Sequence, residues 1–149
     1  MRLLGVILNK ALFEGERMEN MSARVGKARE DYLEAMLMLR EELGYIRSVD
    51  IAEKLGVTKP SVSYMTKQLR QQKLIEMDDD SAITLTEKGE KIATEIYKRH
   101  KTLVDFFMEF GVDEKIAYRD ACLVEHDLSP ETFEAIYKHV NKKRKNKKR

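Results

Sequence analysis

The sequence predicts a mainly α-helical protein, with an N-terminal winged helix-turn-helix of three helices and a two-stranded wing, followed by a second helical domain. Three observations support this prediction. Apolar residues recur at helical spacing through most of the chain after residue 30, a glycine separates two short helical segments, and two short β-prone runs flank an acidic loop. Helix, turn, helix and hairpin in this order are typical of a winged helix.

Capping residues and glycines mark the ends of the expected helices, because Ser, Thr and Asp favour N-caps and Gly favours the position after a helix. The expected helices run from Asp31 to Gly44, from Ser48 to Gly56, from Thr58 past Leu69, from Thr86 to Gly111, from Asp113 to His126, and from Ser129 to Val140. Residues 74–77 and 82–85 are the expected strands of the wing.

Composition and charge limit the class of protein. The 149 residues, 42% of them hydrophobic, suffice for one core or two small ones. A single cysteine excludes a disulfide framework, and no apolar run approaches the ~20 residues of a membrane span. We therefore expect a cytoplasmic protein without a membrane partner.

Two end segments stand apart from the helical pattern. Residues 1–22 show no sustained periodicity, and Met18 and Met21 offer alternative starts, so we expect an unstructured segment or a wrongly assigned start. The net charge of +2 is uneven, because residues 142–149 carry seven positive charges. We expect this segment to be a disordered basic tail that makes at most non-specific phosphate contacts.

Residues 23–88 form the expected winged helix-turn-helix, and its second helix has a polar outer face. Val62, Met65 and Leu69 face inward at helical spacing. The outer face suits phosphate contacts and base edges, and its residues are Lys59, Pro60, Ser61, Ser63, Tyr64 and Lys67. The acidic loop 78–80 would repel phosphates, so we expect the wing tip to stay off the DNA. A helix-turn-helix used only for protein contacts is the alternative.

Cys122, Glu125 and His126 lie at i, i+3 and i+4, so on a helix they leave one face together. That is how a helix presents ligands to a transition metal. Asp31 and Glu34 share a face of the first helix, and His100 lies at the edge of the long helix's apolar stripe. Each of these features alone has an ordinary structural explanation, but together they predict a metal site.

Four motifs carry a resemblance to a known family, and they are Glu30-Asp31-Tyr32-Leu33-Glu34, the Ala52/Gly56/Val62 helix-turn-helix spacing, Tyr97-Lys98-Arg99-His100, and Cys122-x-x-Glu125-His126. Over residues 28–140 the chain resembles the metal-dependent repressors typified by the diphtheria toxin repressor and the manganese transport regulator. The resemblance implies a homodimer that uses a divalent metal as co-repressor and binds palindromic double-stranded DNA operators of metal-uptake genes. It also implies that residues 89–141 form a helical metal-binding and dimerisation domain.

The resemblance implies six metal ligands, which are Asp31, Glu34, His100, Cys122, Glu125 and His126. Cys122 stands where the manganese-sensing branch has a glutamate that bridges two metals, so the two-metal arrangement is left open. Cysteine at this position is typical of the iron-sensing branch, and thiolate favours iron(II) over manganese(II). We therefore expect iron(II) ahead of manganese(II).

A metal bound by ligands from both domains would hold the two domains together. The dimer contact is expected at Phe106, Phe107, Met108 and Phe110, although such a cluster also suits an intramolecular core. Two other functions stay open. A winged-helix regulator that senses an organic ligand or oxidation of Cys122 would bind its operator without metal. A metal-dependent hydrolase is disfavoured because no separate base, nucleophile or substrate loop is evident, so we expect no enzyme.

Overall fold

The computed structural model describes residues 26–148 and confirms a mainly α-helical fold with one antiparallel two-stranded sheet. The expectation for residues 1–22 lies outside the described residues. The helices cover residues 26–43, α2 Ser48–Leu55, α3 Lys59–Gln71, α4 Glu87–Glu109, α5 Glu114–Val124 and α6 Pro130–Lys147; the strands are β1 Ile75–Met77 and β2 Ile83–Leu85.

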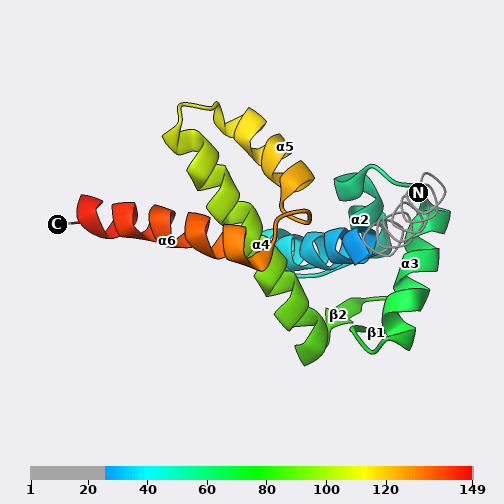
Figure 1. Ribbon diagram of the computed structural model, residues 1–149. Coiled ribbons are helices and arrows are strands. Elements are labelled where there is room, and N and C mark those ends of the chain that lie inside the picture. Colours follow the sequence, from blue (N-terminus) through cyan, green and yellow to red (C-terminus); the bar gives the residue numbers. More distant parts are fainter. Residues whose placement is uncertain (1–25, 149) are drawn as a thin grey trace, which may run out of the picture.

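The helix over residues 26–43 lies between the winged helix and the helices α4, α5 and α6 (Figure 1). Every residue from 32 to 39 is buried, including those on the face that carries Glu34 and Met38. A helix buried all round needs packing partners on opposite sides. One face, with Leu33 and Met36, joins the core of the winged helix, and the other face meets the second domain. This helix therefore belongs to both domains.

The helix-turn-helix forms as the sequence predicts, with one exception at its start. Gly56 takes the left-handed conformation, with φ of 64°, and ends α2. The hydroxyl of Thr58 accepts a hydrogen bond from the amide of Ser61 at 3.3 Å and caps α3. The exception is α2, whose N-cap is Arg47 rather than Ser48, with no side-chain capping bond. Arg47 instead makes a bidentate contact with Asp50 in the first turn.

The wing is the predicted hairpin, in which Ile75 pairs with Leu85 and Met77 with Ile83. Asp78 closes its loop by accepting a hydrogen bond from the amide of Ala82 at 2.9 Å. The amide of Ile83 also donates to the carbonyl of Ile46 at 3.1 Å, which fixes the wing against the segment after the first helix.

α4 begins after Thr86, whose hydroxyl accepts a hydrogen bond from the amide of Gly89 and caps the helix. α4 continues without a break from the wing to α5 (Figure 1). α5 ends at Val124 instead of at His126, and Glu125 is its C-cap. Arg99 donates to the carbonyl oxygens of Glu125 and Leu128 at 3.1 and 3.4 Å, which satisfies acceptors freed where the helix ends.

The expected disordered tail at residues 142–149 is wrong over most of its length, because α6 continues to Lys147. α4 supplies the negative charge that offsets repulsion within the basic segment. Lys143 and His139 pair with Glu109 at 3.1 and 3.2 Å, and Arg144 pairs with Asp105. Within the described residues, no helix has the length and apolar character needed to cross a membrane.

Candidate metal centre

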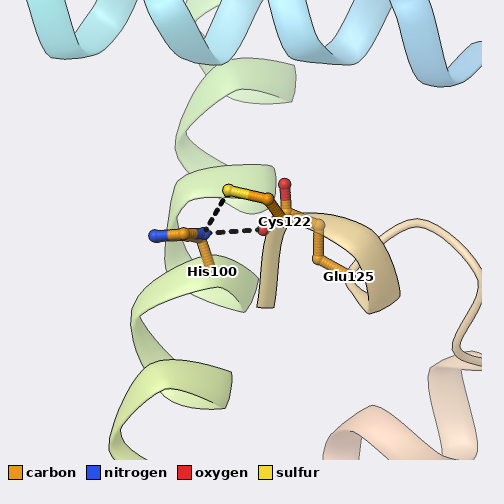
Figure 2. Close-up of side chains that lie close together, drawn as sticks. All are labelled: His100, Cys122 and Glu125. Atoms are coloured by element: carbon orange, nitrogen blue, oxygen red, sulfur yellow. Dashed lines mark hydrogen bonds and ion pairs between the residues drawn. The ribbon is translucent and has the colours of Figure 1, made fainter. Parts of the chain in front are cut away.

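The structure brings all six expected ligands into one cluster between the 26–43 helix, α4 and the end of α5. His100 on α4 is the first centre of this cluster. Its Nδ1 lies 2.9 Å from Oε2 of Glu125 and 3.7 Å from Sγ of Cys122. Figure 2 shows both donors directed at this nitrogen, with the other ring nitrogen turned away. His100, Cys122 and Glu125 are thus arranged to hold one ion.

His126 is the second centre, and it faces the 26–43 helix. Its Nε2 lies 2.7 Å from Oδ1 of Asp31 and 3.3 Å from Oε1 of Glu125. Asp31, Glu125 and His126 therefore form a second group with metal-ligand spacing. This group joins side chains from both domains, whereas His100, Cys122 and Glu125 all belong to the second domain.

Glu34 completes the cluster and shows that the site suits a cation. Its side chain is buried, and Oε1 lies 4.0 Å from Nδ1 of His100 with no hydrogen-bond donor. A buried carboxylate oxygen without a donor is costly unless a cation or a proton satisfies it. Burial, followed by the charge of Glu125, raises the pKa of Glu34 to about 8. At neutral pH Glu34 thus carries a proton that a metal ion would replace.

Glu125 and His126 are strongly perturbed in opposite ways. Burial would raise the pKa of Glu125, but hydrogen bonds from His100 and His126 outweigh it and hold the pKa at about 2. Burial would lower the pKa of His126, but hydrogen bonds to Asp31, Glu125 and Glu30 raise it to about 11. A protonated imidazole therefore neutralises part of the acidic cluster in the metal-free protein.

Cys122 is a free, half-buried thiol on α5. Burial, followed by the charges of Glu125 and Glu34, raises its pKa to about 12. It is consequently a protonated thiol at neutral pH and becomes a thiolate only when a cation replaces the proton. A raised pKa makes a thiol less reactive toward oxidation, because the thiolate is the reactive form.

Glu30 is a functional residue that the sequence did not single out as a ligand or partner. Its Oε2 lies 2.8 Å from Nδ1 of His126, so both nitrogens of this imidazole face carboxylates of the 26–43 helix. A ligating histidine commonly gives its second N–H to a carboxylate, which fixes the tautomer. The sequence signal that could have pointed to Glu30 is its position next to the expected ligand Asp31. Helix spacing alone, however, does not place Glu30 beside His126.

Tyr118 of α5 packs against the imidazole of His100. The two rings meet edge to face with centroids 4.3 Å apart, and the Tyr118 hydroxyl donates to Sδ of Met38 at 3.8 Å. These contacts fix the orientation of the imidazole. Tyr118 is a second residue that sequence reasoning left out of the site.

The expected DNA-contacting residues all lie on the exposed side of α3, and Tyr64 is 65% exposed.

The expected dimer residues include exposed side chains and side chains that pack within the chain. Phe110 and Met108 are exposed, at 72% and 43%. Phe106 stacks edge to face on Phe110, with centroids 5.1 Å apart, and packs toward His139 of α6. Phe106 therefore contributes to packing within the chain.

A winged helix whose first helix contributes carboxylates to a buried group of side chains that could hold a metal ion is typical of one class, the metal-responsive DNA-binding regulators. The comparisons with known proteins agree. Residues 25–83 match the iron-dependent repressor N-terminal DNA-binding domain, and residues 86–148 match the metal-binding and dimerisation domain of the same family. The chain belongs to the iron-dependent repressor family. It is a transcriptional regulator and not an enzyme.

The chain is also similar to particular members of this family. The chain is 42% identical over 107 residues to the transcriptional regulator MntR of Escherichia coli O6:H1, covering 72% of this chain and 69% of that protein. It is 39% identical to MntR of Bacillus subtilis strain 168, covering 72% and 75%. The solved structure of the manganese regulator SloR superposes with a TM-score of 0.67 at 32% identity, covering 76% of this chain and 53% of SloR. The chain thus spans about half the length of SloR. These relatives do not support the expected preference for iron(II) over manganese(II).

Metal affinity is expected to rise with pH between about pH 6 and 8. Glu34, His126 and Cys122, with pKa values of about 8, 11 and 12, all hold protons at neutral pH and must release them to ligate. Each released proton steepens the dependence by about tenfold per pH unit. The contribution of Glu34 ends above its pKa, and the other two persist. Titration calorimetry in buffers of different ionisation enthalpy counts the protons, and an affinity independent of pH would contradict this assignment.

Glu30→Gln is expected to lower metal affinity by about 10- to 100-fold, because the N–H of His126 loses its anionic acceptor while the shape of the side chain is kept. Glu53→Gln, on the exposed side of α2, removes the same charge away from the cluster and serves as the control. Calorimetry of both variants checks the prediction. Equal affinities would show that Glu30 does not position His126.

Proposed function

We propose that this protein represses transcription with a divalent metal as co-repressor, held by Asp31, Glu34, His100, Cys122, Glu125 and His126. The main support for the proposal is the 2.7 Å contact between Nε2 of His126 and Oδ1 of Asp31. This contact joins the second domain to the first helix of the DNA-binding domain. Buried carboxylate, imidazole and thiol groups converge there, and Oε1 of Glu34 has no donor.

Manganese(II) is the co-repressor that we propose for the cluster. The solved relatives include the manganese regulator SloR and a manganese-dependent transcriptional repressor in complex with manganese. Carboxylates are also the most numerous donors in the cluster, and oxygen ligands suit manganese. Iron(II) is the runner-up, since Cys122 adds a softer donor.

A bound divalent cation would supply the positive charge that the cluster otherwise obtains from protons. In its absence, Glu34 and Glu125 are held together by a shared proton and His126 by its imidazolium charge. Asp31 and Glu34 move with the winged helix, whereas His100, Cys122, Glu125 and His126 move with the second domain. Ligation by both sets therefore limits how the winged helix turns against that domain.

The winged helix would bind DNA through the exposed face of α3. We propose that Tyr64, Ser61 and Ser63 lie at base edges, that Lys59 and Lys67 contact phosphates, and that Pro60 fixes the first turn of the helix. The wing tip at residues 78–80 is acidic and exposed, so it stays away from the phosphates. Metal that fixes the winged helix would hold α3 in the orientation that suits the major groove.

A homodimer would present two such helices to a palindromic operator, with half-sites about one helical turn apart. The matched dimerisation domain supports a dimer. Exposed apolar side chains on α5 and the end of α4 offer a surface for it, and they are Met108, Phe110, Ile116 and Leu123. We propose this surface as the dimer contact, with Phe106 and Phe107 supporting it from behind.

Operator binding is expected to weaken by about 10- to 100-fold when the metal is removed, which is the range of typical coupling between two ligands. An operator selected from random DNA with the manganese-loaded protein is titrated with manganese and with chelator. Asp31→Ala should remove the difference. Lys67→Ala, the matched control on the DNA side, should weaken binding in both states and reduce the salt slope by about one. Equal affinity with and without chelator would rule out the metal-dependent mechanism.

A further inference from the structure

The last turns of α6 carry a dense positive charge. Residues 138–148 contain seven lysine or arginine side chains and no aspartate or glutamate. The helix continues through this segment to Lys147. In Figure 1 these turns extend beyond the other elements and end on the opposite side of the molecule from α3. Residues 138–148 are therefore an ordered segment, which we call the basic arm, and it is well separated from the expected DNA-contacting face of α3.

One side of the basic arm is held against α4. Val140 is 1% exposed and anchors the arm in the protein. Lys143 pairs with Glu109 at 3.1 Å, and Arg144 pairs with Asp105. These two cations are neutralised within the chain, so their role is to fix the arm on α4.

The other side of the basic arm carries lysines that the chain leaves largely unneutralised. Lys138, Lys142 and Lys145 lie at i, i+4 and i+7, so they share one face of the helix, and all three are exposed. At about 3.6 residues per turn this face points away from the side that meets α4. Within residues 26–148, no carboxylate pairs with Lys142 or Lys145, and Lys138 has only the exposed Glu134 at 3.6 Å. We call these three residues the lysine stripe.

The helix dipole does not account for the lysine stripe. Cations stabilise the C-terminal end of a helix, but this effect is confined to the last turn. It applies to Lys145 and Lys147, whereas Lys138 and Lys142 lie further from the end of α6. Lysines four residues apart also repel one another and weaken a helix. An external polyanion would relieve this repulsion.

Duplex DNA fits the lysine stripe better than a membrane does. The stripe is about 10 Å long, since a helix rises about 1.5 Å per residue, and duplex DNA carries one charge about every 1.7 Å of its axis. A membrane-surface helix inserts an apolar face into the bilayer. The apolar face of α6 is not free for this, because Phe133 and Val140 are 8% and 1% exposed. The matched DNA-binding domain shows that duplex DNA is a polyanion that this family binds.

We propose that the basic arm is a second DNA-binding surface, in which Lys138, Lys142 and Lys145 contact the phosphate backbone of duplex DNA without reading its sequence. Because the arm and α3 lie at opposite ends of the chain, the DNA segment on the arm differs from the segment that α3 of the same protomer contacts (Figure 1). A protein bound to one duplex can thus hold a second one. The arm contains none of the six expected metal ligands, so this contact does not depend on metal or on the proposed repressor function.

The test measures both affinity and bridging with the full chain and random-sequence duplex DNA in the presence of chelator. Affinity is titrated over a range of salt concentrations, and bridging is read as capture of a fluorescent duplex by protein loaded on an immobilised one. We expect the wild type to capture the second duplex. Lys142→Ala/Lys145→Ala should reduce capture by about 10-fold or more and lower the slope of log affinity against log salt by about two, because two phosphate contacts are lost. Lys142→Arg/Lys145→Arg should restore both.

Lys91→Ala/Lys115→Ala is the matched control, because it removes the same charge from exposed positions on α4 and α5. It should leave capture and the salt slope unchanged. Equal losses in the two alanine variants would show a general effect of net charge and would overturn the inference. An unchanged slope and capture in Lys142→Ala/Lys145→Ala would also overturn it, and binding of the wild type to phosphatidylserine vesicles that this variant alone abolishes would then assign the arm to a membrane. Circular dichroism checks that each variant keeps its helix content.

Discussion

The contact between His126 and the carboxylates of the 26–43 helix is the interaction on which the structure depends. It links the turn after α5 to the first helix of the winged helix through Glu30 at 2.8 Å and Asp31 at 2.7 Å. The 26–43 helix transmits this link, because its opposite face forms the core of the DNA-binding domain. A change of ligands at one end of this helix is thus a change in how the recognition helix is held, which is a physical basis for metal-dependent DNA binding.

Charge burial explains why the cluster responds to metal. Glu34, His100 and Glu125 are removed from water between two domains, and buried ionisable side chains require hydrogen-bond or ionic partners. In the metal-free protein, protons on Glu34, His126 and Cys122 supply those partners. A divalent ion replaces several protons at once, so metal and protons compete for the same groups. The choice among metals then depends on the donor atoms of the ligands, which here are carboxylate oxygen, imidazole nitrogen and thiol sulfur.

Much of this fold could be predicted from the sequence, because it rests on local signals. Gly56 and the caps Thr58 and Thr86 define helix ends through backbone geometry, and a motif resemblance named the six ligands. The end of α5 could not be predicted in this way, since it depends on Arg99 reaching carbonyls 26 and 29 residues away. The helical tail likewise depends on Asp105 and Glu109 of α4. The contact of Glu30 with His126, and the contacts of Glu125 with both His100 and His126, arise from tertiary structure, so local sequence signals could not predict them.

The central claim is that metal joins the two domains through this cluster. A crystal structure of the manganese-loaded protein, with anomalous scattering to locate the metal, tests it most directly. The account predicts an anomalous peak in direct contact with the ligand atoms of both Asp31 and His126. A peak held only by His100, Cys122 and Glu125, with Asp31 and Glu34 turned away, would contradict it, because such a metal would not connect the DNA-binding domain to the second domain.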